Sequence, residues 1–128
     1  MRLLLDTNAF LWWAKNDPQL STPARIAVAD RANEIFLSSV STWELAIKVA
    51  IGKMILNATV PVFVGSQILQ YNFISLPINY DHTYQVETMT LHHKDPFDRL
   101  LIAQAMVENL VIVTSDSKFG PYGVATLW

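Results

Sequence analysis

Residues 2–15, RLLLDTNAFLWWAK, contain the pattern that sets the fold class. The apolar run at residues 2–5 predicts a short buried strand, and residues 7–15 predict a helix that ends before Pro18. Asp6 lies at the junction between the two. We therefore expect an α/β protein whose first strand ends in a carboxylate.

The same alternation of short apolar runs and helical segments continues to the end of the chain. Strands that are apolar throughout and alternate with helices are typical of a parallel sheet with both faces covered. The sequence thus predicts a three-layer α/β fold with a mostly parallel central sheet flanked by helices. Further strands are expected at residues 34–38, 73–77, 110–114 and 124–127, and further helices between Ser21 and Asn33 and at residues 41–51, 61–71, 80–90 and 96–109.

Length and composition limit the class of protein. A chain of 128 residues predicts a single domain spanning residues 1–128. The absence of cysteine excludes disulfides, thiolate zinc sites and cysteine nucleophiles. Asp6 interrupts the N-terminal apolar run too early for a signal peptide, and no apolar stretch approaches the roughly 18 residues of a membrane helix. We expect a cytoplasmic protein with no membrane contact.

The surface is expected to be unusually apolar. Hydrophobic residues make up 52% of the chain and charged residues 16%, against about 25% charged in a typical domain. The net charge of −2 disfavours a DNA-reading protein, but it is compatible with a nuclease whose acidic centre binds cations. We predict a protein–protein contact that includes at least one tryptophan, the alternative being that all are core residues: Trp12, Trp13, Trp43 and Trp128.

Four carboxylates from separate segments are predicted to meet at one edge of the sheet. Asp6 ends the first strand, and Glu44 falls in the first turn of the helix after the second strand. Asp98 falls in the first turn of the helix that leads into the strand at residues 110–114, and Asp116 follows that strand. Ligands of open α/β sheets bind beyond the carboxyl ends of the strands, where all four acids are expected.

Clustered carboxylates require compensation, because like charges a few ångströms apart repel by several kcal/mol. Either some of them stay protonated or a cation holds them together. Oxygen ligands without thiolates favour the hard cations Mg²⁺ and Mn²⁺. Such a cation activates water for phosphodiester hydrolysis. The pattern therefore indicates a metal-dependent phosphodiesterase.

Each acid also has a structural interpretation. Asp6 can cap the following helix, and Asp116 can belong to a turn with Ser115 and Ser117. Ser41-x-x-Glu44 forms a capping-box pattern, Glu44–Lys48 is an i,i+4 ion pair, and Asp98 follows an Asp95-Pro96 helix start. None of these interpretations explains why all four acids fall at the same edge.

The histidines are less specific. His92 and His93 precede Asp95, where they are placed either to reach a phosphate or an ion, or to form a solvated loop. The pattern around His82 predicts an exposed position on a helix.

Four segments together resemble the PIN domain family, and in particular its VapC-type toxins. They are LLLDTNAFLWW (3–13), SSVSTWELAIKVAIGK (38–53), HHKDPFDRLLIAQA (92–105) and VIVTSDSKF (111–119), in the family's order and spacing. The resemblance implies a Rossmann-like sheet, an acidic Mg²⁺ or Mn²⁺ site and endonucleolytic cleavage of RNA. It also implies a VapB-type antitoxin as partner, a homodimer, and possible higher toxin–antitoxin assemblies.

The resemblance also implies residue roles. Asp6, Glu44 and Asp98 match three metal-site acids of the family, and Asp116 matches its more variable fourth acid. A second ion, or Lys48 or Arg99, is expected to stabilise the departing oxygen. The supporting positions are Thr7, Ser39, Lys48, Asp95, Arg99 and Thr114.

Other functions remain open. One is a catalytically silent PIN-like module that acts through a protein partner, and another is a structure-specific DNA nuclease. A phosphatase with a covalent aspartate is disfavoured, because such enzymes usually have a second acid two residues after the first, where this chain has Asn8.

Overall fold

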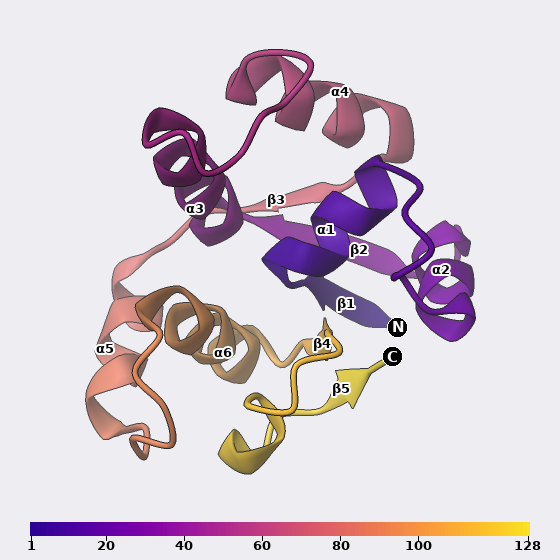
Figure 1. Cartoon of the computed structure of the whole chain (residues 1–128). Helices are drawn as coiled ribbons and strands as arrows, with labels where there is room; N and C mark the ends of the chain where they lie inside the picture. Colours follow the sequence, from indigo (N-terminus) through magenta and orange to yellow (C-terminus); the bar gives the residue numbers. More distant parts are fainter.

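Strands and helices alternate along the whole chain in the computed structural model, which describes residues 1–128 (Figure 1). The strands are β1 (Arg2–Leu5), β2 (Glu34–Ser38), β3 (Ile74–Leu76), β4 (Val111–Val113) and β5 (Thr126–Leu127). The helices are α1 (Thr7–Ala14), α2 (Thr22–Ala29), α3 (Ser39–Ala50), α4 (Val60–Tyr71), α5 (Tyr80–Thr88) and α6 (Pro96–Glu108), with a 3₁₀ turn, η1, at Gly120–Tyr122.

The five strands form one sheet in the order β3-β2-β1-β4-β5. Every neighbouring pair is parallel, and Leu4 of β1 lies between Phe36 of β2 and Ile112 of β4. The chain moves outward from β1 to β2 and β3 on one side and to β4 and β5 on the other. The carboxyl ends of β1 and β4 therefore lie at a switch point, where sheets of this kind bind ligands.

Helices cover both faces of this sheet, which confirms the predicted three-layer α/β fold (Figure 1). Successive residues of a strand point to opposite faces, so the side chains of β1 divide between two buried clusters. Leu3 and Leu5 pack with α1, α2 and α4, including Phe10. Leu4 packs on the other face with α6, including Leu101 and Ile102.

The start of α3 differs from the prediction. The helix begins at Ser39, because the Ser38 hydroxyl accepts a hydrogen bond from the Val40 N–H at 2.9 Å and caps it. Ser41 is therefore a buried helical residue, and the Ser41-x-x-Glu44 capping box is wrong. Glu44 lies in the second turn of α3 instead of the first.

The expected exposure of His82 is also wrong, since its side chain is fully buried between α5 and α6. Its Nδ1 accepts the Asn79 N–H at 3.1 Å, and its Nε2 lies 2.9 Å from the Glu108 carboxylate. The outward positions of α5 belong instead to Tyr80 and Tyr84.

None of the helices has the combined length and hydropathy needed to cross a bilayer.

Candidate metal centre

Asp6 leaves β1 at the switch point and caps α1. Its N–H continues the sheet by donating to the Val113 carbonyl at 3.1 Å, and its carboxylate accepts the Ala9 N–H at 2.6 Å. Burial raises the pKa of Asp6 to about 6, against the lowering effects of the Thr114 hydroxyl and the Ala9 N–H. The capping interpretation is correct for Asp6, but the cap does not offset the cost of burying its charge.

Asp98 lies in the first turn of α6, whose start is fixed by its neighbours. Asp95 caps the helix by accepting the N–H groups of Phe97 and Asp98 at 2.9 and 3.0 Å, and Pro96 occupies the first turn. Because Asp95 provides the cap, the Asp98 carboxylate does not bond the backbone of the helix. The Asp98 side chain is only 21% exposed. Burial raises its pKa to about 6; the hydrogen bond from His93 opposes this rise, and the charge of Asp95 adds to it.

Asp116 follows β4 in a tight turn. Its N–H donates to the Thr114 hydroxyl at 3.0 Å, and its carboxylate accepts the Lys118 N–H at 2.9 Å. The charge of Asp116 raises the pKa of both Asp6 and Asp98, and the charge of Asp98 raises that of Asp6. These three carboxylates therefore form one electrostatically coupled group, as the strand order requires.

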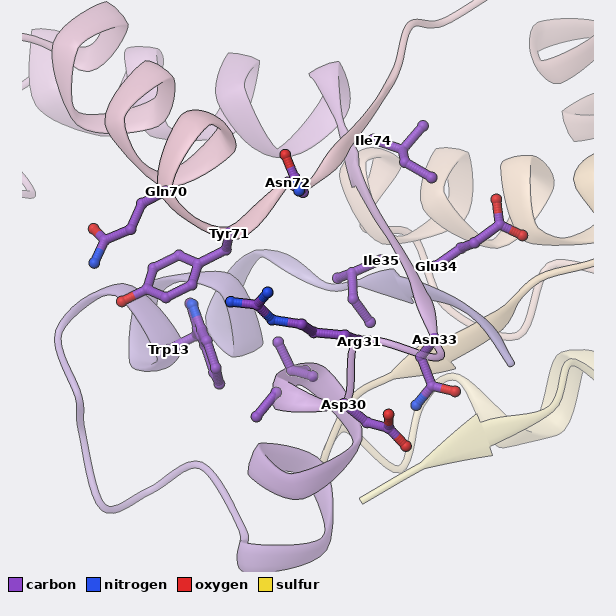
Figure 2. Close-up of a pocket in the computed structure, with 12 residues that line it drawn as sticks. Trp13, Asp30, Arg31, Asn33, Glu34, Ile35, Gln70, Tyr71, Asn72 and Ile74 are labelled. Atoms are coloured by element: carbon purple, nitrogen blue, oxygen red, sulfur yellow. The ribbon is translucent and has the colours of Figure 1, made fainter.

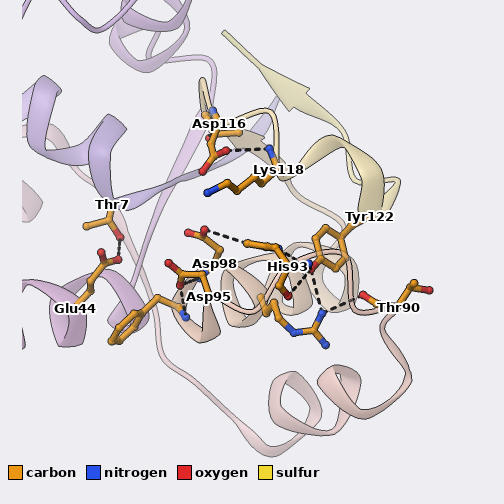
Figure 3. A network of polar contacts seen from close by, with 12 residues as sticks. Thr7, Glu44, Thr90, His93, Asp95, Asp98, Asp116, Lys118 and Tyr122 are labelled. Atoms are coloured by element: carbon orange, nitrogen blue, oxygen red, sulfur yellow. Dashed lines mark hydrogen bonds and ion pairs between the residues drawn. The ribbon is translucent and has the colours of Figure 1, made fainter.

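Glu44 borders this group from α3 but is already paired (Figure 3). One carboxylate oxygen accepts the Thr7 hydroxyl at 2.8 Å, and the other lies 2.8 Å from the Lys48 ammonium. Its charge has no part in the raised pKa of Asp6 or Asp98. The predicted Glu44–Lys48 pair is confirmed, and breaking it would free Glu44 for a bound cation.

The predicted supporting residues divide into two groups. Thr7, Lys48, Asp95 and Thr114 contact the acids or their immediate turns. Ser39 does not, because its hydroxyl accepts the Ile78 N–H at 3.2 Å.

Arg99 also does not contact the acids. It is buried, and its Nη1 donates to the Thr90 carbonyl at 3.0 Å and to the Tyr122 hydroxyl at 3.1 Å. Arg99 therefore does not lie where a cation that stabilises a leaving oxygen is expected.

Two polar residues at the site were not predicted from the sequence. The Ser41 hydroxyl lies 3.0 Å from the Thr7 hydroxyl and donates to it, since the Thr7 proton goes to Glu44; the sequence pattern instead assigns Ser41 to a helix cap. Tyr122 lies beside His93 and Arg99, and no local pattern links it to either.

The donor set fits a hard divalent cation. Asp6 and Asp116 have no cationic partner, and the Asp98 carboxylate is hydrogen-bonded only to His93. Carboxylate oxygens without thiolate neighbours match the preference of Mg²⁺ and Mn²⁺ for oxygen ligands. No three histidine or acidic side chains lie close enough to enclose one ion. Because Mg²⁺ keeps several water ligands, one or two of these carboxylates are enough to bind it.

A separate hollow of about 500 Å³ opens at the opposite edge of the sheet (Figure 2). Its wall includes Trp13 and Tyr71, whose rings meet edge to face at 5.1 Å, and the Arg31 guanidinium points toward them. Asp30 and Glu34 also line the hollow, but none of the coupled acids Asp6, Asp98 and Asp116 does. The hollow and the acid group are thus distinct features.

A parallel α/β sheet with coupled carboxylates at its switch point defines the class of α/β proteins with an acidic site at the carboxyl edge, and sequence comparison specifies the family. The PIN domain family matches residues 3–123 of this chain. The chain therefore belongs to the PIN domain family. No curated protein matches the sequence.

Solved structures share the fold over the whole chain at low identity. VapBC2 from Rickettsia felis, bound to a DNA fragment from its promoter, has a TM-score of 0.76 at 16% identity, covering 100% of this chain and 99% of that one. VapBC-1 from nontypeable Haemophilus influenzae has a TM-score of 0.67 at 19% identity, with 99% and 97% covered. FitAcB from Neisseria gonorrhoeae has a TM-score of 0.64 at 20% identity, with 98% and 96% covered.

Proposed function

We propose that this chain is a divalent-metal-dependent endoribonuclease and the toxin of a type II toxin–antitoxin pair. The observation that carries the proposal is the coupled group of Asp6, Asp98 and Asp116 at the switch point of the sheet. The charges of Asp98 and Asp116 raise the pKa of Asp6 there, and the charge of Asp116 raises that of Asp98, although the three acids come from separate segments. Membership of the PIN domain family supports this chemistry.

In this proposal Asp6, Glu44, Asp98 and Asp116 hold Mg²⁺ or Mn²⁺. The bound ion supplies Lewis acidity and lowers the pKa of its water, so that no protein nucleophile is needed. Thr7 keeps the Glu44 carboxylate at the edge of the site through its hydroxyl. Lys48, once released from Glu44, places an ammonium beside the phosphodiester and favours binding of the RNA backbone.

The proposed protein partner is a VapB-type antitoxin. The similar structures include VapBC complexes, and this chain exposes large apolar side chains on several helices, among them Trp43 at 50% and Leu69 at 83%. The hollow lined by Trp13, Tyr71 and Arg31 adds an aromatic and cationic recess of the kind that receives an anchoring side chain. A homodimer, and a higher assembly with the antitoxin, would cover the remaining apolar surface.

The test is cleavage of single-stranded RNA with Mg²⁺, with Mn²⁺ and with EDTA. Asp6→Asn and Asp98→Asn should each abolish a metal-dependent activity of the wild type. Asp81→Asn is the matched control, because Asp81 is an exposed acid in the first turn of another helix. Cleavage that persists in EDTA or in Asp6→Asn would contradict the proposal.

The same assay separates the alternatives. A DNA strand of matching sequence that is cut while RNA is spared would identify a DNA nuclease. Absence of cleavage with any metal, combined with binding of the protein encoded beside this gene, would identify a binding module.

A further inference from the structure

A continuous series of hydrogen bonds leads from Arg99 to Asp98 by way of Tyr122 and His93 (Figure 3). Arg99 Nη1 lies 3.1 Å from the Tyr122 hydroxyl oxygen. That oxygen lies 2.7 Å from His93 Nδ1, and His93 Nε2 lies 3.2 Å from Asp98 Oδ2. The series joins α6, the loop before it and the turn η1.

The chemistry of the partners gives the series a direction. A guanidinium only donates, so the Tyr122 oxygen accepts from Arg99, and it also accepts from the His93 backbone N–H at 3.2 Å. The phenolic proton then points to His93 Nδ1, which is closer than the alternative acceptor, the His93 carbonyl at 3.4 Å. A neutral imidazole that accepts at Nδ1 has its proton on Nε2 and donates it to Asp98.

The members of the series are well shielded. Arg99 is 9% exposed, and the side chains of His93 and Asp98 are 13% and 21% exposed. Arg99 is anchored a second time by the Thr90 carbonyl, and its guanidinium lies 5.7 Å from the centre of the Tyr122 ring. Hydrogen bonds in such surroundings hold their members in one geometry more firmly than exposed ones do.

We propose that Arg99, Tyr122 and His93 are positioning residues that hold the Asp98 carboxylate in its ligand orientation. Asp98 Oδ2 is occupied by His93, while Oδ1 has no hydrogen-bond partner and stays available to a cation shared with Asp6 and Asp116. Tyr122 lies six residues after Asp116, so the same bonds also hold the Asp116 turn against α6. The proposal rests on the proposed function, and it gives Arg99 a different role from stabilising the leaving oxygen.

Binding of Mn²⁺, measured by electron paramagnetic resonance of the free ion, tests the proposal without RNA. Groups that orient metal ligands typically contribute about 10- to 100-fold to affinity, so we expect the Kd for Mn²⁺ to rise by about that factor in His93→Ala and Tyr122→Phe. His93→Gln, which keeps a donor toward Asp98, should recover part of the affinity. His92→Ala is the matched control, because the His92 ring packs on Tyr122 at 4.7 Å without bonding an acid.

A measurement on the metal-free wild type tests the direction of the series. Nitrogen-15 NMR of the His93 ring should show the proton on Nε2 and none on Nδ1 at a pH where the ring is neutral. A proton on Nδ1 would overturn the series, whatever the protein does with metal.

The remaining outcomes are also decisive. If His93→Ala and Tyr122→Phe bind Mn²⁺ within twofold of the wild type, the residues are structural only and the proposal is wrong. If the wild type binds Mn²⁺ but cuts no RNA, the nuclease proposal fails and the binding constants still decide the role of His93. If the wild type binds no Mn²⁺, both proposals fall.

Discussion

Asp6 has two roles that oppose each other in the metal-free protein. As the cap of α1 it stabilises the fold through the Ala9 N–H, and as a buried anion it destabilises the fold. One pKa unit corresponds to about 1.4 kcal/mol, so the rise from 3.8 to about 6 makes its ionised form cost roughly 3 kcal/mol at neutral pH. Asparagine separates the two roles, because it caps helices as well as aspartate but carries no charge.

Asp6→Asn should therefore raise the free energy of unfolding at pH 8 in EDTA by about 1–3 kcal/mol, since the cap remains and the buried charge is removed. Asp6→Ala should gain about 1 kcal/mol less, because it also loses the cap. Urea unfolding measures both. RNA cleavage should fall by more than about 100-fold, beyond the loss typical of residues that only orient ligands. A less stable Asp6→Asn protein would show that the carboxylate is structural.

The pH dependence of stability follows from the same shifts. Asp6 and Asp98 both have a pKa raised from 3.8 to about 6, so the folded state binds protons more tightly than the unfolded state. Their full contribution is present below about pH 4 and is lost as pH rises through 6. In EDTA, the free energy of unfolding should fall by a few kcal/mol between pH 4.5 and 7.5.

Urea unfolding at a series of pH values checks this slope, and Asp98→Asn should reduce it. Saturating Mg²⁺ should remove most of the slope by favouring the ionised carboxylates. A stability that rises with pH over this range would show that the carboxylates are compensated by other groups.

At the residue scale, the sequence predicted which acids belong to the candidate site. It did not predict the hydrogen-bond partners of nearby residues such as Arg99 and Ser39. Asp6, Asp98 and Asp116 are recognisable because each follows or begins a predicted element. The contacts of Arg99 with Tyr122 and of Ser39 with Ile78 depend on the tertiary fold, across 23 and 39 residues of sequence. No local pattern encodes such contacts.

At the scale of elements, α6 presents the site and the core from one helix. Its inward face contributes Leu101 and Ile102 to the core, and its first turn presents Asp98 at the acid edge. Asn109, in the left-handed conformation at φ 55°, ends it before β4. The position of Asp98 is therefore set by the cap at Asp95.

Asp95→Ala should destabilise the protein by about 1–2 kcal/mol, because the N–H groups of Phe97 and Asp98 both lose their acceptor. For a domain of this size, the Tm should fall by roughly 3–8 °C in thermal unfolding followed by circular dichroism. Asp95→Asn is the control, since it keeps an acceptor, and its Tm should stay near that of the wild type. Equal losses in both variants would point to the charge of Asp95 instead of its cap.

The start of α3 shows why element boundaries were less predictable than element types. Ser38, Ser39 and Ser41 are all suitable caps, so the sequence offers three equivalent starts. The structure selects Ser38, whose hydroxyl also donates to Gln104 of α6. A tertiary contact across the core thus decides between local alternatives.

At the scale of the whole molecule, the alternation of elements predicted the layers, and the strand order had to come from the structure. Parallel strands and two covered faces follow from the apolar runs, whereas nothing in β1 itself says that it pairs with both β2 and β4. The coupling of Asp6 to Asp116 depends on that pairing. The sequence therefore predicted that the acids lie at one edge of the sheet. It could not predict which of them are close enough to affect one another's charge.

Metal binding should stabilise the whole domain through linkage. A ligand that binds only the folded state adds about 2.7 kcal/mol at a concentration of 100 times its Kd. The Tm of the wild type should therefore rise with Mn²⁺ concentration, and that of Asp6→Asn should rise much less. Differential scanning calorimetry measures both, with Ca²⁺ as a second ion for comparison. An equal rise in both proteins would place the bound ion elsewhere.

The central place of β1 has a consequence for biosynthesis. During translation, Leu3 to Leu5 of β1 leave the ribosome well before Val111 to Val113 of β4, so one of their two edges stays unpaired until β4 has been synthesised. Asp116 emerges later still, and it completes the coupled acid group. A nascent chain arrested before Asp116 lacks part of this acid group, so the proposed nuclease would be unable to cleave the RNA of the ribosome that translates it until translation has passed that residue.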